Sequence, residues 1–194
     1  MPRTKEQYEA LRAEKKQLIM DAALEVFAEA GYALTSIDQI AKRAGIAKGL
    51  IYTYFESKED LLHQILVFGV KKMSEGLFPE QMTPEIFVNS VEKMFDNVLI
   101  YRDFFKLYTA LSVQPEVTNK LGPLADEHRG LHSMIELYKR HFGDKATKEL
   151  LLMTTLSKGY SILALFGDRQ KTIPLDLLKE TVMDIVKQKF GISE

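Results

Sequence analysis

The chain has 194 residues, which is enough for one sizeable core or for two domains of unequal size. Its 46% hydrophobic and 27% charged residues are ordinary for a soluble globular protein, and the absence of cysteine excludes disulfides, thiolate metal sites and thiol catalysis. The formal net charge of −1 gives no overall attraction to nucleic acid, so any basic surface has to be local.

The N-terminal stretch MPRTKEQYEALRAEKK is polar where a secretory signal has an apolar centre. No run of apolar residues approaches the roughly 20 residues that a membrane-spanning helix needs. We therefore expect a cytoplasmic protein that has no membrane partner.

Apolar residues recur at helical spacing between residues 15 and 30 and predict a first helix, which Gly31 ends in a left-handed conformation. These apolar residues are Leu18, Ile19, Ala22, Ala23, Val26, Phe27 and Ala30. In the short second helix that follows, Ser36 and Gln39 form a capping box, and Gly45 closes the helix.

The stretch AGIAKGLIYTYFESKEDLL, residues 44–62, predicts a third helix and then a fourth that begins at Ser57, with Asp60 as its capping partner. Two short helices joined by a tight glycine-containing turn and packed on a longer helix form a helix-turn-helix. The second helix of such a unit is the one presented to the major groove of DNA.

Residue types in the third helix favour a nucleic-acid partner. Gly49 costs roughly 1 kcal/mol relative to alanine in a helix, a loss that makes sense where the backbone approaches a partner closely. Lys48 reaches base edges or a phosphate from the same turn. Tyr52 and Tyr54 either direct their hydroxyls to phosphates or are half-buried core residues.

The local charge supports DNA binding only in part. Residues 41–58 carry +3, from four basic residues and Glu56, whereas the four acids of residues 21–40 give −4. DNA binding requires these charges to lie on opposite faces, and the alternative is that the basic residues form an ordinary solvated surface.

Residues 18–62 closely resemble the DNA-binding domain of the TetR family of bacterial transcriptional regulators. The resemblance covers about the first third of the chain and is specific, because AALEVFAEAGY, TSIDQIAKRAG and KGLIYTYFESKEDLL match together. It implies an all-α homodimer with a helix-turn-helix DNA-binding domain, residues 1–57, that binds a palindromic operator. It also implies a helical domain, residues 58–194, that binds a small-molecule effector and forms the dimer.

Carried over residue by residue, the resemblance predicts DNA contacts from Ser36, Lys48, Gly49, Tyr52, Thr53 and Lys58, with Tyr54 as a weaker candidate. We expect Lys48 and Thr53 to face bases and Tyr52 and Lys58 to face phosphates. Ala47 departs from the family, which often has a serine or threonine there. The change removes a phosphate contact and a helix cap worth roughly 1 kcal/mol.

Beyond residue 62 the fourth helix continues without a linker, so it belongs to both domains and forms a lever between them. Further helices are expected at about 84–101, 102–113, 123–142, 146–166 and 174–190. They are rich in aromatic residues and methionines, which are most often core but also suit an apolar cavity between helices.

The candidate ligand-binding residues are Phe68, Met94, Phe95, Tyr101, Arg102, Phe105, Tyr108, His132, Tyr138 and Tyr160. Arg102 and His132 either orient an anionic ligand or form surface salt bridges. His128, His132 and Glu136 share a helix face at metal-chelating spacing. Two histidines without a third firm ligand are a weak signal, so we predict no metal and no cofactor.

Residues 150–166, LLLMTTLSKGYSILALF, are too apolar for a helix with one face in water, and the last helix has a broad apolar stripe. Both helices are either buried within one subunit or, as the resemblance favours, form a four-helix interface with a second copy.

Together these features predict a ligand-responsive repressor that a small apolar or amphipathic effector releases from its operator. The alternative is a helical protein- or ligand-binding module without sequence-specific DNA binding, because the N-terminal region is not net basic. An enzyme is not expected, since the chain has no nucleophile elbow, phosphate-binding glycine loop or zinc-protease motif.

Overall fold

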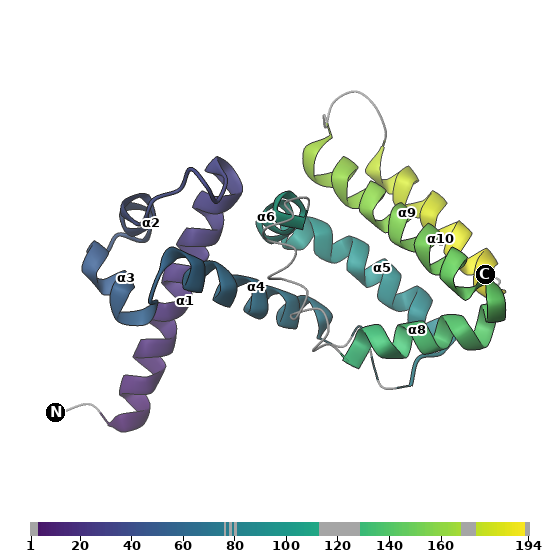
Figure 1. Cartoon of the computed structure of the whole chain (residues 1–194), viewed down its shortest axis with the longest axis horizontal. Coiled ribbons are helices and arrows are strands. Elements are labelled where there is room, and N and C mark those ends of the chain that lie inside the picture. Colours follow the sequence, from purple (N-terminus) through teal and green to yellow (C-terminus); the bar gives the residue numbers. More distant parts are fainter. Residues whose placement is uncertain are drawn as a thin grey trace.

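The computed structural model describes residues 4–75, 77, 79, 81–112, 129–167 and 174–192, which are helical apart from short turns. The N-terminal helices are α1 (Lys5–Ala30), α2 (Ile37–Ala44), α3 (Lys48–Tyr54) and α4 (Lys58–Ser74). They are followed by α5 (Pro84–Ile100), α6 (Arg102–Ser112), α8 (Arg129–Phe142), the short 3-10 helix η1 (Gly143–Lys145), α9 (Ala146–Phe166) and α10 (Leu175–Phe190). The prediction of an all-α fold is confirmed (Figure 1).

Local hydrogen bonds set the bounds of α2 and α4. Ser36 Oγ accepts a bond from the Gln39 backbone N–H at 3.3 Å, and Gln39 Oε1 accepts from the Ser36 backbone N–H at 2.7 Å, which confirms the capping box. At α4, Ser57 Oγ accepts from the Asp60 N–H at 3.0 Å. The Asp60 carboxylate accepts instead from the Glu56 N–H at 2.9 Å, so the predicted reciprocal box is only half formed.

The first helix begins earlier than predicted, at Lys5 rather than at residue 15. A complete capping box between Thr4 and Gln7 starts it, and residues 4–10 are all exposed. This segment is polar on every side, so apolar periodicity gives no sign of it. Gly31 ends α1 with φ 83° and ψ 148°, a positive-φ conformation that suits glycine but is not the predicted left-handed one.

Two apolar clusters divide the molecule, and α6 contributes to both. The N-terminal cluster joins α1–α4 to Phe104, Leu107 and Leu111 of α6, while the C-terminal cluster joins α5, α8, α9 and α10. Phe105 packs against both clusters. The N-terminal core thus continues past the predicted boundary between residues 57 and 58, and α4 runs from the N-terminal helices towards the C-terminal ones (Figure 1).

Candidate functional site

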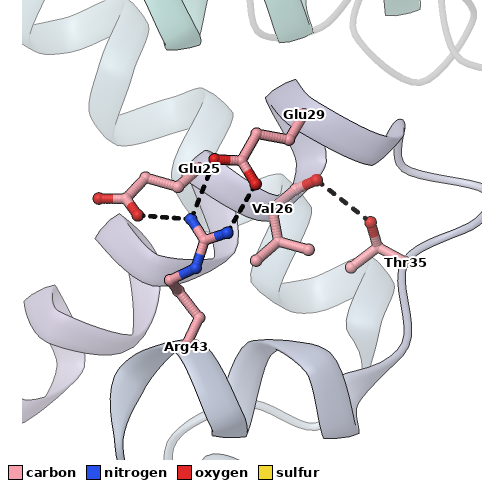
Figure 2. Close-up of polar contacts among 5 residues, drawn as sticks. All are labelled: Glu25, Val26, Glu29, Thr35 and Arg43. Atoms are coloured by element: carbon pink, nitrogen blue, oxygen red, sulfur yellow. Dashed lines mark hydrogen bonds and ion pairs between the residues drawn. The ribbon is translucent and has the colours of Figure 1, made fainter.

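Polar contacts link α2 to α1 beside their apolar packing (Figure 2). The Arg43 guanidinium donates to Glu25 Oε2 at 2.8 Å and to Glu29 Oε2 at 2.6 Å, and this bonding lowers the pKa of Glu29. Behind it, the buried Thr35 hydroxyl donates to the Val26 carbonyl at 3.4 Å. Arg43 therefore pairs with two acids of α1, so these charges do not lie on opposite faces as DNA binding was expected to require.

The face of α3 opposite the core presents four of the predicted DNA-contacting residues together. Lys48, Gly49, Tyr52 and Thr53 are exposed, while Ile51 is buried in the N-terminal cluster. Their spacing places them on one side of the helix, because residues four apart are neighbours on a helix surface. Tyr52 is 52% exposed, so its predicted role as a half-buried core residue does not apply.

Lys48 has an intramolecular partner in the free protein. Its Nζ lies 2.8 Å from Asp38 Oδ2, and this bond raises the pKa of Lys48. The two side chains are 50% and 68% exposed, and exposed ion pairs contribute little to stability. Lys48 can therefore exchange Asp38 for a phosphate or a base edge at small cost.

Two other candidate DNA-contacting residues, Lys58 and Tyr54, make contacts within the fold. Lys58 Nζ donates to the carbonyls of Tyr32 and Thr35 at 3.1 and 3.0 Å and lies 4.4 Å from the centroid of the Tyr32 ring. Tyr54 is half-buried, with the Arg12 guanidinium 5.8 Å from its ring centroid. Their predicted contacts with DNA stay predictions, and the core role weighed for Tyr54 agrees with its burial.

The start of α3 shows two features that the fold does not explain. Ala47 occupies the N-cap without a side-chain cap bond, whereas the exposed Ser36 caps α2. A methyl group at Gly49 would meet no atom within 4 Å, and Gly49 is not among the glycines with positive φ. Among the described residues, neither space nor backbone conformation requires glycine there.

The C-terminal helices line a cavity of about 270 Å³, open on one side, between α5, α8 and α9, with one residue from α6. Three of the predicted ligand-binding residues line it, namely Met94, Phe105 and Tyr138. The sequence analysis missed the rest of the lining, which consists of Phe87, Ser90, Val91, Met134, Leu150, Met153, Thr154, Ser157, Lys158 and Ser161.

Four more predicted ligand residues lie elsewhere. Phe95 and Tyr160 are buried in the C-terminal cluster with ring centroids 4.4 Å apart, so they are core. Phe68 and Tyr101 line a second, smaller cavity of about 130 Å³ between α1, α4 and α6. The predicted set therefore does not form one site.

The polar candidates also differ from expectation. Arg102 donates to two backbone carbonyls near the end of α9 at 2.8 and 3.4 Å, so it fastens α6 to α9 and does not line the cavity. Tyr108 is 37% exposed and stacks on the ring of Phe104. The side chain of His132 and all of His128 lie outside the described residues, among which no group of three potential metal ligands occurs.

One face of α9 carries exposed apolar side chains. Leu151, Ile162 and Phe166 are 64%, 50% and 56% exposed, and Leu177 of the neighbouring α10 is 55% exposed. Between them, a methyl group at Gly159 would meet no atom within 4 Å. Figure 1 shows α9 and α10 side by side at one edge of the molecule. Among the described residues, α9 thus buries one face in the subunit and leaves an apolar face exposed, beside which α10 exposes Leu177.

Known proteins with similar sequences identify the family of this chain. The family model described as bacterial regulatory proteins, tetR family, matches residues 19–65. The uncharacterized HTH-type transcriptional regulator TtgW of Pseudomonas putida is 43% identical over 103 residues, 46% of this chain and 75% of TtgW. The chain belongs to the TetR family.

Similarity to other TetR-family proteins extends over most of the chain. The uncharacterized HTH-type transcriptional regulator YuxN of Bacillus subtilis (strain 168) is 27% identical over 192 residues, 93% of this chain and 65% of YuxN. This chain covers less than two thirds of the length of the first curated relatives. A solved TetR-like transcriptional regulator from Rhodococcus sp. RHA1 shares the fold, with a TM-score of 0.75, 19% identity and 100% of both chains covered.

These relatives are helix-turn-helix transcriptional regulators and not enzymes, which confirms both predictions at the level of the family. One helical stretch of the described residues, Met134–Phe166, is long and apolar enough by composition to cross a membrane, which corrects the expectation that none is. It is weak support for a span, because η1 interrupts it and Gly143 has a φ of 53°. Figure 1 shows α8 and α9 running in different directions.

Proposed function

We propose that this protein is a transcriptional repressor that binds a palindromic operator as a homodimer and is released by a small apolar or amphipathic effector. The observation that carries the proposal is the exposed face of α3, where Lys48, Gly49, Tyr52 and Thr53 lie together. In the complex Lys48 and Thr53 face bases, while Tyr52 contacts a phosphate.

The ends of the neighbouring helices add phosphate contacts on either side of α3. Ser36 is exposed at the first turn of α2, whose N-terminal N–H groups and dipole favour an anion. The Lys58 ammonium lies against the Thr35 carbonyl, next to that turn, and adds positive potential there. The internal bonds of Lys58 therefore position its charge for a bound phosphate.

The dimer forms through α9 and α10, packed against the same helices of a second copy. Support comes from the exposed Leu151, Ile162, Phe166 and Leu177 and from the open space over Gly159, which lets a second helix approach closely. A twofold axis through this contact gives an isologous four-helix interface. It places two α3 helices to read half-sites about 34 Å apart, one turn of DNA.

The effector binds in the larger cavity and acts through α6. Phe105 lines this cavity and also packs against the N-terminal cluster, so a ligand that displaces it moves the support of α4. Release of DNA requires that the ligand bind more tightly to the dimer whose two α3 helices are wrongly spaced for the operator than to the dimer whose helices fit it. Occupation of the operator then blocks transcription until the effector releases it.

Selection from a random-sequence duplex library at two salt concentrations tests the DNA-binding role. We expect a palindrome to be enriched, with affinity that falls as salt rises. Tyr52→Phe and Lys48→Ala should each weaken binding by about tenfold, as expected when one phosphate or base contact is lost. The matched controls Tyr108→Phe on α6 and Lys148→Ala on α9 should bind like the wild type. No enrichment even at low salt contradicts the proposal.

Gly49→Ala should have opposite effects on stability and on DNA binding. Alanine has space there and a better helix propensity, so the free energy of unfolding should rise by about 0.5–1 kcal/mol. The added methyl group should lower operator affinity, because it holds the α3 backbone away from DNA. Chemical denaturation and a binding titration measure the two quantities. A variant that is more stable and binds DNA normally shows that Gly49 makes no close contact.

A protein- or ligand-binding module without DNA recognition remains the second candidate, and a specific observation favours it. Arg43, Lys48 and Lys58 all have intramolecular partners in the free protein, which leaves a weak basic surface. Salt dependence separates the two functions. Phosphate contacts make log affinity fall steeply with log salt, whereas a protein interface responds less.

A further inference from the structure

Among the described residues, mostly apolar side chains and one charged side chain line the larger cavity. On α9 its lining runs from Leu150 to Ser161, twelve residues whose eleven rises of 1.5 Å span about 16 Å. Lys158 lies towards the Ser161 end of this stretch. Within the described residues Lys158 forms no ion pair, and no carboxylate lines the cavity. An anionic ligand would therefore meet one unopposed cation.

Hydroxyl groups surround this lysine on the same helix. Thr154 and Ser161, one turn before and about one turn after Lys158, donate to carbonyls of α9 at 2.8 Å and 2.9 Å. Their protons are thus occupied, so Lys158 is the charged donor that this part of the lining offers to a ligand. One point charge on a flexible stem suits a single carboxylate, whereas a phosphate group is usually held by several donors.

The end of the cavity near Leu150 and Tyr138 has no cation in its described lining. Tyr138 lines the cavity there and is 1% exposed, and its hydroxyl has no hydrogen-bond partner among the described residues. Burial, and after it the nearby Glu149, raise the pKa of Tyr138, so this end stays neutral at the phenol. Glu149 lies one residue before Leu150 and pairs with Lys189 at 2.7 Å. A carboxylate is thus favoured at the Lys158 end of the cavity, where the unopposed cation lies.

We propose that the effector is an alkyl carboxylate with about ten non-hydrogen atoms, whose carboxylate pairs with Lys158 and whose chain lies towards Leu150 and Tyr138. The size follows from the volume, because about 270 Å³ holds roughly nine groups at the ~30 Å³ of a liquid water. This assignment rests on the proposed function, since it names the ligand class of the effector site.

Isothermal titration of the full chain with octanoate, 1-octanol and octylamine tests the assignment, because the three share one alkyl chain and differ in head group. We expect octanoate to bind at least about tenfold more tightly than 1-octanol, and octylamine to bind most weakly. Lys158→Met keeps the apolar stem and removes the charge. It should lower the affinity for octanoate to that for 1-octanol and leave 1-octanol unchanged, while Lys148→Met on the same helix should change neither.

Equal binding of the three compounds, absence of binding by all of them, or indifference of octanoate to Lys158→Met overturns the assignment. Operator binding measured in the same samples separates this result from the proposed function. If 1-octanol releases the operator as well as octanoate does, the proposed ligand class is wrong, but the proposed function as a ligand-responsive regulator is supported. If octanoate binds through Lys158 and operator affinity is unchanged, the carboxylate site stands and the regulatory role is wrong.

Discussion

Ile162→Glu is expected to give a monomer and to weaken operator binding by at least about 100-fold. Ile162 is 50% exposed on α9, in line with Leu151 and Phe166 at helical spacing. In the proposed dimer the substitution places one carboxylate from each subunit in the interface, where its desolvation costs several kcal/mol. A monomer also loses the effective concentration that the second half-site provides, a factor of 10² to 10⁴.

Sedimentation at micromolar concentration and a titration with the selected operator measure both effects. Ile100→Glu is the matched control, because Ile100 is 68% exposed on α5, outside the α9 and α10 face. It should leave the mass and the operator affinity unchanged. A dimeric Ile162→Glu protein, or a wild-type monomer, rules out this interface and calls for another explanation of the exposed apolar face of α9.

The elements of the DNA-binding unit were predictable because the signals that define them are local. Ser36 and Gln39 lie three residues apart and satisfy each other, and Gly45 has the positive φ of 65° that ends α2. The early start of α1 was also locally encoded, by Thr4 and Gln7. Apolar periodicity cannot detect this segment, because the segment has no apolar face. Capping signals were therefore more reliable here than the apolar pattern.

The lining of the larger cavity was predictable only in part, because its residues come from four helices. Residue type suggested Met94, Phe105 and Tyr138, which line the cavity, but it gave equal weight to Phe95, which packs in the core. Arg102 was assigned to the ligand although its partners are carbonyls more than 60 residues away in sequence. Lys158, the cation that does line the cavity, looked like one polar residue in an apolar helix. Only the tertiary structure separates these cases.

Gly69→Ala is expected to destabilise the protein by about 1–3 kcal/mol, although alanine is normally the better helix former. A methyl group at Gly69 in α4 would overlap the ring of Phe104 in α6, which is 4% exposed. Glycine is thus required at this position by the close crossing of the two helices. Thermal or chemical unfolding measures the loss, and Val67→Ala, at an exposed position of α4, should cost much less.

The same contact lies on the proposed route from the effector to DNA. Phe105 lines the cavity, Phe104 meets Gly69, and α6 is tied to the end of α9 by Arg102. If the overlap causes the destabilisation, Phe104→Leu should relieve it. The double variant Gly69→Ala/Phe104→Leu should then be more stable, by at least about 0.5 kcal/mol, than the sum of the two single changes in unfolding free energy predicts.

The double variant restores packing but not the rigid contact between α4 and α6, so effector binding should release the operator less completely. If the two changes in unfolding free energy are strictly additive, Gly69 and Phe104 do not interact. If the effector still releases the operator as fully as from the wild type, the coupling does not pass through the α4–α6 crossing.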